Sequence, residues 1–476
     1  MQSPSEEQCQ VVNAIQENHN VIVDACAGSG KSTTVLTCAK TLHTNKFIQI
    51  TFNKQLQTEV QEKIIEEKLQ NIQVYTYHGL AVKYYASDCH NDSGIRKMLR
   101  ENTPFRTEIP SFDVMVLDET QDMTKVYFDL IQKFILDMGE PIQLLILGDE
   151  KQALYGFKGA DARFLTMADQ CWRHFPALKT DSFEVHPLRM SYRITNSMRR
   201  FVNEAMLGEN RMQSCREGPP VVYIRRSMYD ARILYCMIKK LIQTEQASYD
   251  DFFILCRSLK LTNWSVRQLE NILVQNNIPC FIPSNENKDD LDSRVIENKV
   301  VFSTFHASKG RQRPYVIVLG FDDSHFSHFA RDKDPNICPN ELYVACTRAT
   351  KKLFVWESMD RKTSICPFVK KSHNEMMSCP YISFQGIPSG RKPQIEEPET
   401  YEMKKYCVQP TELIRFLPES SLDVISPVVD SMFTVLQPAE NTIDIPSVHF
   451  TSNGYCEEVS DINGIVLPLM FFNHFY

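Results

Sequence analysis

Short runs of apolar residues, many of them β-branched, recur along the chain with helix-like segments between them. Such continuous runs are typical of parallel strands that are buried on both faces of a sheet. The runs form two groups, before and after about residue 185, and they lie at 21–23, 48–51, 114–117 and 144–147, then at 252–255, 300–303 and 316–319. The pattern predicts an α/β fold with two tandem domains, each built on a parallel sheet.

Breaks in this pattern predict the domain boundaries. The segment 181–187 interrupts it and a helix-like stretch follows at 195–206, so we expect a first domain at 1–185 and a second at 186–360. Residues 361–400 are expected to be a linker, because the stretch from 385 onward is rich in Pro, Gly and charge and has no apolar period. The C-terminal region, 401–476, mixes strand-like and helix-like fragments and carries no motif that indicates a function.

Composition places the chain among ordinary globular proteins. Its 476 residues, 43% hydrophobic and 23% charged, exclude wholesale disorder. The net charge of −7 provides no general positive field, so a nucleic-acid partner would need a local basic channel. The 15 cysteines are scattered, as in reduced proteins, and Cys366, His373 and Cys379 fit no standard zinc spacing. A polar start and the lack of a long apolar run predict an intracellular protein of cytoplasm or nucleus, neither secreted nor bound to a membrane.

The first candidate site is a phosphate-binding loop. The string VIVDACAGSGKST, residues 21–33, reads as a buried strand, a turn of small residues and the start of a helix. Backbone N–H groups in such a turn can surround a phosphate, Lys31 can reach its oxygens and the Ser32 hydroxyl can bind Mg²⁺. The usual first glycine is Ala25 here, and the alternative interpretation is a glycine-rich turn with a solvated lysine.

Acidic residues end a later apolar strand, in FDVMVLDETQD at 112–122. Asp118 is expected to bind Mg²⁺ together with Ser32, and Glu119 to orient or deprotonate the attacking water. Taken alone, such a pair is as consistent with the N-cap of a helix. Gln152 follows the next strand and is expected beside the phosphates.

Aromatic residues and a cation follow Gln152 in LYGFKG. Tyr155, Phe157 and Lys158 suit single-stranded bases and their backbone, although aromatic residues lie more often in a protein core.

Read in order, these motifs resemble those of superfamily 1 helicases of the Rep, PcrA and UvrD type. Ten segments match between residues 4 and 350: PSEEQCQVV, ACAGSGKS, ITFNKQL, TYHGLA, DETQD, GDEKQALYGFKGA, SYRIT, ILCRSLKLTNWSVRQLENILVQNNIPCFI, VFSTFHASKG and ELYVACTRAT. The resemblance implies two tandem RecA-like P-loop domains with parallel sheets, reduced insertion subdomains and a C-terminal accessory region. It also implies ATP and Mg²⁺ as cofactors.

The resemblance also implies roles for individual residues. Catalysis would involve Lys31, Asp118, Glu119, Gln152 and two arginine fingers, Arg193 and Arg348. The nucleotide would be bound by Gln8, Ala27, Gly28, Ser29, Gly30, Lys31, Ser32, Thr33, Tyr192, Gly310 and Gln312. Lys309 and Gly310 would couple the domains. Nucleic acid would be bound by Phe52, Asn53, Thr76, His78, Tyr155, Phe157, Lys158, Arg257, Thr304 and His306.

Three features depart from the family pattern. Thr33 replaces an arginine that contacts adenine, and Gln312 replaces a glutamate that contacts ribose. The family's helical insertions have little room, near 79–111 in the first domain and at 284–299 in the second.

The resemblance implies an ATP-dependent DNA helicase or translocase moving 3′–5′ on single-stranded DNA. Two alternatives stay open: an ATPase and translocase, stimulated by single-stranded DNA, that strips proteins without unwinding, and an ATP-switched DNA-binding regulator. The expected partners are single-stranded DNA, tailed duplex DNA and an accessory protein bound by the C-terminal region.

Overall fold

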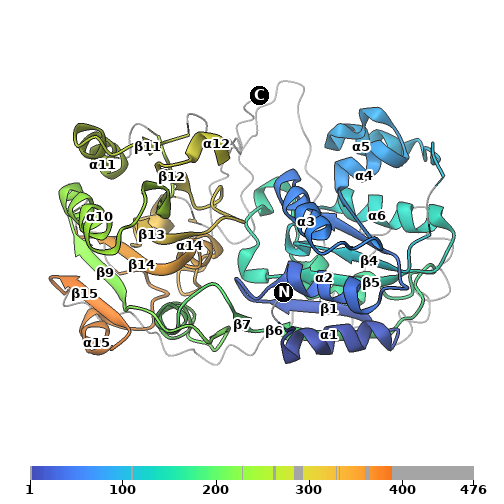
Figure 1. Ribbon diagram of the computed structural model, residues 1–476, viewed down its shortest axis with the longest axis horizontal. Coiled ribbons are helices and arrows are strands. Elements are labelled where there is room, and N and C mark those ends of the chain that lie inside the picture. Colours follow the sequence, from blue (N-terminus) through green and yellow to red (C-terminus); the bar gives the residue numbers. More distant parts are fainter. Residues whose placement is uncertain are drawn as a thin grey trace, which may run out of the picture. The chain divides into compact units, whose positions relative to one another are not determined.

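The protein is described here by a computed structural model. It describes residues 3–108, 111–227, 229–260, 264–283, 293–328, 330–331, 333–359 and 365–388. Within these ranges the chain forms two large sheets in which all neighbouring strands run parallel, one from each half of the sequence, and a small two-stranded sheet (Figure 1). The prediction of an α/β fold with one large parallel sheet in each half of the chain is confirmed.

The first sheet has the strand order β3-β2-β4-β5-β1-β6. Its strands are β1 (Asn20–Ala25), β2 (Phe47–Thr51), β3 (Ile72–Thr76), β4 (Val114–Leu117), β5 (Gln143–Gly148) and β6 (Phe183–Leu188). Successive residues of β1 enter different cores: Val21 and Val23 pack in one cluster and Ile22 in another. Because neighbouring side chains of a strand point to opposite faces, both faces of this sheet are buried, as the continuous apolar runs predict.

Helices cover each face. One cluster joins the sheet to α1 (Glu6–Gln16), α2 (Lys31–Thr41) and α3 (Lys54–Glu66). The other joins it to α4 (Tyr77–Tyr84), α5 (Asp92–Arg100), α6 (Lys125–Met138), α7 (Arg163–Thr166) and α8 (Ala168–Cys171). Within the predicted insertion near 79–111, α4 and α5 are joined by a short 3₁₀ turn, and both pack on α6. This insertion is therefore a small helical layer on the first sheet.

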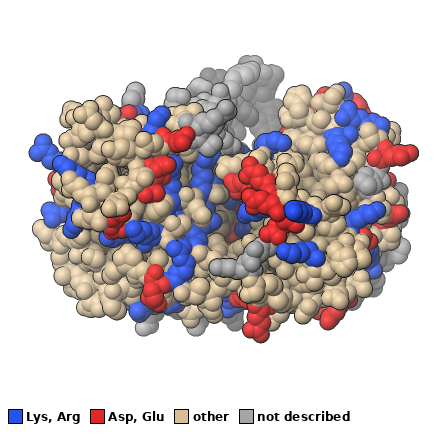
Figure 2. Space-filling view, viewed as in Figure 1, with Lys and Arg blue, Asp and Glu red and all other residues tan. Residues whose placement is uncertain are grey.

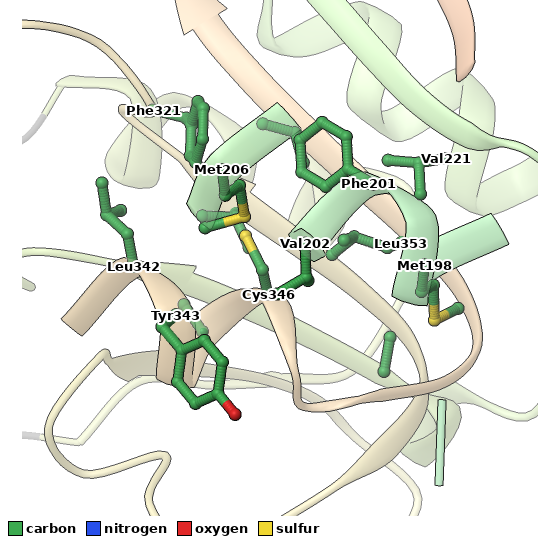
Figure 3. Packing of buried hydrophobic residues seen from close by; sticks show 14 of the residues in the cluster. Met198, Phe201, Val202, Met206, Val221, Phe321, Leu342, Tyr343, Cys346 and Leu353 are labelled. Atoms are coloured by element: carbon green, nitrogen blue, oxygen red, sulfur yellow. The ribbon is translucent and has the colours of Figure 1, made fainter. Parts of the chain in front are cut away.

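The second sheet has the order β11-β12-β10-β13-β14-β9-β15. Its strands are β9 (Val221–Arg226), β10 (Phe252–Cys256), β11 (Cys280–Phe281), β12 (Val300–Thr304), β13 (Arg313–Leu319), β14 (Ala349–Ser358) and β15 (Ile382–Gly386). One face is covered by α10 (Ala231–Glu245) and α11 (Trp264–Gln275). The opposite face packs on α9 (Asn196–Arg200), a π-helix (Phe201–Leu207), α14 (Asn340–Cys346) and α15 (His373–Ser378) (Figure 3).

Short elements complete the description. Strands β7 (Met190–Ser191) and β8 (Gln213–Ser214) pair with each other, and α12 (Ser293–Ile296) and α13 (Ser324–His328) are single turns or little more. In the predicted second insertion, residues 284–292 lie outside the described residues. Among the described residues, no helix has the length and apolar character that crossing a membrane requires.

Two boundaries differ from the sequence-based expectation. Residue 185 lies inside β6, which pairs with β1 as far as Leu188, so the first sheet extends beyond the predicted end. The linker expected at 361–400 is wrong for α15 and β15, because β15 forms the edge of the second sheet and pairs with β9. Phe384 of β15 stacks on Tyr223 with ring centroids 5.7 Å apart. The sequence did not predict this contact, because the residues that follow Phe384 are polar. The remainder, 389–400, and the C-terminal region lie outside the described residues.

His373, which the sequence analysis considered beside Cys366 and Cys379, has a protein partner. His373 is fully buried, and its Nε2 is hydrogen-bonded to Glu357 Oε2 at 2.7 Å. No group of three or more His, Cys, Asp or Glu in the described part of the chain could hold a metal ion.

Candidate nucleotide and nucleic-acid site

A large cavity of about 1500 Å³ is lined by residues that follow strands of both sheets. The first half contributes the loop 28–33, Glu119 and Gln152, and the second contributes Arg193, Lys309 and Arg348. Figure 2 shows Lys and Arg side chains gathered beside the hollow in this face. The chain therefore has a local basic wall despite its negative net charge.

The phosphate-binding loop joins β1 to α2. Gly28 and Gly30 have φ of 78° and 87°, a backbone conformation that L-side chains rarely adopt. A Cβ on Gly28 would lie 2.5 Å from the Cβ of Arg193, so the loop packs directly against the segment that carries this arginine. Ser29 Oγ is buried, and no described group bonds to it. Because an unpaired buried hydroxyl is costly, this loop fits a ligand that supplies the missing partner, as a phosphate oxygen would.

Opposite charges meet beside the loop. Lys31 Nζ lies 2.9 Å from Glu119 Oε1. Burial disfavours the ammonium, but the carboxylates of Glu119 and Asp118 outweigh it and raise the pKa of Lys31. Burial likewise opposes ionisation of Glu119, whereas Lys31 and Lys309 lower its pKa. Both groups are therefore charged, and Lys31 is neutralised by the residue expected to activate water.

Asp118 is placed as a buried carboxylate at the end of β4. Its Oδ1 accepts from the Glu119 N–H at 2.9 Å, and its Oδ2 accepts from Gln49 Nε2 at 3.2 Å. Burial and then the charge of Glu119 raise the pKa of Asp118 to about 6. A bound cation would favour its ionised form, so one carboxylate beside a phosphate loop fits a Mg²⁺ site completed by Ser32.

Two arginines from the second half line the same cavity. Arg348 is 1% exposed, and its Nη2 donates to Gln152 Oε1 at 3.1 Å. Burial and then the neighbouring Arg193 lower the pKa of Arg348 to about 9. Arg193 Nε donates to Gln312 Oε1 at 2.6 Å, and its Nη1 donates to the carbonyl of Thr347 at 3.4 Å. The structure thus brings both predicted fingers to the cavity that Lys31 lines.

Lys309 makes three polar contacts with the first half. Its Nζ bonds to Asp122 Oδ2, donates to the carbonyl of Gln152 at 2.6 Å and lies 3.7 Å from Glu119 Oε2. The family resemblance assigned domain coupling to Lys309 but did not place it among the catalytic residues. The position of Lys309 in the family-like segment VFSTFHASKG was the signal that could have predicted this contact.

Several nucleotide candidates have other partners in the structure. The Ala27 N–H donates to Tyr343 Oη at 3.3 Å, so this group is not free for phosphate. Gln312 binds Arg193 and not a ribose. Gln8 closes the capping box of α1, with its Oε1 accepting from the Ser5 N–H at 3.0 Å, while its Nε2 approaches Gly30. Tyr192 is 39% exposed and is held through its N–H by the Gly28 carbonyl at 2.9 Å.

Two further nucleotide candidates line the cavity. Thr33 is half-buried and lines the cavity, and Gly310, with φ of 82°, lies on the opposite wall.

Aromatic residues gather at one end of the cavity. Phe52 and Tyr155 stack with ring centroids 5.3 Å apart and planes inclined by 9°. Phe157 is 72% exposed and meets His306 edge to face at 5.7 Å. Lys158 Nζ lies 5.1 Å from the Tyr155 ring centroid. These five residues form the aromatic cluster of the cavity.

Other nucleic-acid candidates are used structurally. Thr76 Oγ1 accepts from the Gly79 N–H at 3.0 Å and caps α4, while His78 is bonded to Asp92 at 2.9 Å; neither lines the cavity. Asn53 lines it but also caps α3, accepting from the Leu56 N–H at 2.9 Å.

Two polar candidates line the cavity from the second sheet. Thr304 Oγ1 accepts from the Ala307 N–H at 3.2 Å, and Arg257 lies 3.6 Å from the buried Asp322. Burial lowers the pKa of Arg257, an effect that Asp322 opposes.

Comparison with known proteins gives partial matches along the chain. Family models for an AAA domain and a UvrD-like helicase C-terminal domain match residues 8–158 and 283–359. A mimivirus protein from Acanthamoeba polyphaga mimivirus, named "Putative ATP-dependent DNA helicase", is 24% identical over 394 residues, covering 74% of this chain and 53% of that protein. ATP-dependent DNA helicase PcrA of Staphylococcus aureus is 27% identical over 112 residues, which are 22% of this chain and 15% of PcrA.

This chain spans about half the length of the mimivirus relative and matches a smaller share of PcrA. The solved structure of PRRSV helicase aligns with a TM-score of 0.37 and 11% identity over 74% of this chain and 55% of that one, too little to compare sites. The two family models fall on the two halves that meet at the cavity, and the relatives are named as ATP-dependent DNA helicases, so the chain is similar to helicases of the UvrD/PcrA type.

Proposed function

We propose that this protein is an ATP-dependent DNA helicase or translocase that couples ATP hydrolysis to 3′–5′ movement on single-stranded DNA. The observation that best supports this proposal is a cluster of charged residues across the cavity. Lys31 and Glu119 come from the first half, and Arg193, Lys309 and Arg348 come from the second. Cations arranged in this way suit the charge that develops on a transferred phosphoryl group. The names of the relatives support the same activity.

ATP is proposed to bind at the loop 28–32, with Lys31 on the outer phosphates and Ser29 bonded to a phosphate oxygen. Mg²⁺, held by Ser32 and Asp118, would neutralise phosphate charge. Glu119 orients the attacking water once Lys31 has moved to the phosphates. Gln152, bonded to Arg348 at 3.1 Å, links the phosphate site to the second half.

Movement follows from the same contacts. Lys309 and Arg348 both bond to Gln152 of the first half. The two walls of the cavity therefore attract each other most strongly when the charges that they carry are opposite. Binding and hydrolysis of ATP alter those charges and thereby shift the equilibrium between open and closed cavities. A strand held by both walls is then moved by each cycle.

The test is a strand-displacement assay with 3′-tailed and 5′-tailed duplexes, run beside ATPase assays with and without single-stranded DNA. We expect DNA-stimulated hydrolysis and displacement only of the 3′-tailed duplex. Displacement that requires a 5′ tail contradicts the direction, and hydrolysis unaffected by DNA contradicts the translocase.

A second candidate is a translocase that strips proteins without unwinding. The small size of the first insertion, which contains only α4, a 3₁₀ turn and α5 among its described residues, favours it. Stimulated hydrolysis with removal of a protein block from single-stranded DNA, but without displacement from either duplex, would identify this activity.

Phe157→Ala is expected to weaken binding of single-stranded DNA by about 1 to 3 kcal/mol, because a stacking face for a base is lost. The ring is 72% exposed, so its removal leaves the core intact. Fluorescence anisotropy with a labelled oligonucleotide measures the change. Tyr229→Ala is the matched control, since Tyr229 is 52% exposed and does not line the cavity. Equal affinities for Phe157→Ala and Tyr229→Ala would contradict the role of the aromatic cluster.

A further inference from the structure

A buried hydrogen-bond network links the start of the phosphate loop to the end of β5. Tyr343 Oη, on α14, accepts from the Ala27 N–H at 3.3 Å and donates to Asp149 Oδ2 at 3.2 Å. Asp149 is fully buried, and its Oδ2 also accepts from Gln152 Nε2 at 2.8 Å. Figure 3 shows the Tyr343 ring at the edge of its apolar cluster, with the hydroxyl turned away from the other labelled residues. One hydroxyl from the second half therefore contacts both segments of the first half that face the phosphates.

Arg211 completes this network from the other side. Its two terminal nitrogens each lie 2.6 Å from an oxygen of Asp24, at the end of β1, and Nη2 also lies 3.0 Å from Asp149 Oδ1. A planar guanidinium can make this bidentate contact and still reach a third oxygen, which an ammonium cannot do. Arg211 thus fixes the ends of β1 and β5 relative to each other.

The backbone beside Arg211 is itself fixed. Asn203, in the π-helix, donates to the Met212 carbonyl at 2.8 Å and accepts from the Met212 N–H at 3.3 Å. Asn203 is 1% exposed, and the π-helix packs in the main core of the second half. Irregular turns of this kind often occur at functional sites, because they redirect side chains that a regular helix would present elsewhere.

We propose that Tyr343 and Arg211 are positioning residues for ATP hydrolysis, an inference that rests on the proposed function. They act through Asp149, whose carboxylate holds Gln152, and Gln152 in turn accepts a hydrogen bond from Arg348. Without the network, Gln152 and Arg348 lose their fixed geometry, although the groups that bind the phosphates remain. The network therefore affects the chemical step more than nucleotide binding.

The closing experiment is Tyr343→Phe, which removes the hydroxyl and keeps the buried ring. We expect kcat for ATP hydrolysis in the presence of single-stranded DNA to fall about tenfold. The affinity for a fluorescent ADP analogue should change by less than about threefold, because the loop 28–32 is untouched. Tyr315→Phe is the matched control: the Tyr315 hydroxyl donates to Glu245 of α10 at 2.8 Å, neither residue lines the cavity, and loss of the hydroxyl should leave kcat unchanged.

A second variant tests whether Arg211 acts through the geometry of its contacts or only through its positive charge. Arg211→Lys keeps the positive charge but loses the bidentate geometry, so we expect kcat to fall about tenfold here as well. Wild-type kcat in Arg211→Lys overturns the assignment of Arg211. Wild-type kcat in Tyr343→Phe, or an equal fall in Tyr315→Phe, overturns that of Tyr343. A wild-type chain that hydrolyses no ATP contradicts the proposed function itself and overturns the inference with it.

Discussion

Replacement of Lys31 by alanine is expected to abolish ATP hydrolysis, with a fall in kcat of about three orders of magnitude. Lys31 begins α2 directly after the loop and lines the cavity. No other cation of that half takes its place in the described cavity, since Lys158 lies with the aromatic cluster and Lys63 is on α3. The measurement is steady-state phosphate release at saturating ATP and single-stranded DNA.

The variant should still fold. Removal of Lys31 leaves Glu119 with a counter-ion, because Lys309 lies 3.7 Å from its Oε2. Lys40→Ala provides the control: Lys40 also forms an ion pair with a glutamate, Glu67 at 3.0 Å, but its side chain is 56% exposed and does not line the cavity. Exposed pairs contribute little, so Lys40→Ala should hydrolyse ATP as the wild type does. Hydrolysis within about tenfold of wild type in a folded Lys31→Ala protein would contradict the phosphate-loop assignment.

The sequence predicted the two sheets because each strand is buried on both faces and therefore reads as a continuous apolar run. The family resemblance, and not the strand pattern, implied which loops share the nucleotide site. Lys31, Glu119, Gln152, Arg193 and Arg348 all reach one cavity as expected.

The sequence did not predict the features that are decided by hydrogen bonds and packing in the folded chain. Thr76 and Asn53 satisfy helix N–H groups, a local use that competes with ligand binding and has the same residue preference. Edge strand β15 lies close to a Pro-rich stretch, and only its pairing with β9 distinguishes it from a linker. Arg211 falls in no motif, so its contacts with Asp24 and Asp149 could be found only from the fold.

Glu119→Gln should separate binding from hydrolysis. We expect kcat to fall by about two to four orders of magnitude, because the amide cannot accept a proton from water. ATP should bind more tightly at the same time. In the structure Glu119 holds Lys31 at 2.9 Å, so a phosphate must compete with this carboxylate for the ammonium, and the neutral amide removes both the competition and a repulsive charge.

The backbone at this position makes the substitution informative. Glu119 has φ of 53°, in the left-handed region that is uncommon for residues other than glycine. Glutamine has a similar backbone preference and shape, so the strain is equal in both proteins and the comparison isolates the carboxylate. Glu67→Gln is the control, because it alters an ion pair outside the cavity with Lys40, whose side chain is 56% exposed, and should change neither kcat nor affinity.

The measurements are phosphate release and equilibrium binding of radiolabelled ATP on filters, with wild type, Glu119→Gln and Glu67→Gln side by side. Tighter binding with slow hydrolysis would mean that the Lys31–Glu119 pair keeps the empty site neutral and opens when the phosphates arrive. Weaker ATP binding in Glu119→Gln would show that the pair organises the loop and does not compete with the nucleotide. Unchanged hydrolysis would remove Glu119 from the chemistry, because water would then be activated elsewhere in the cavity.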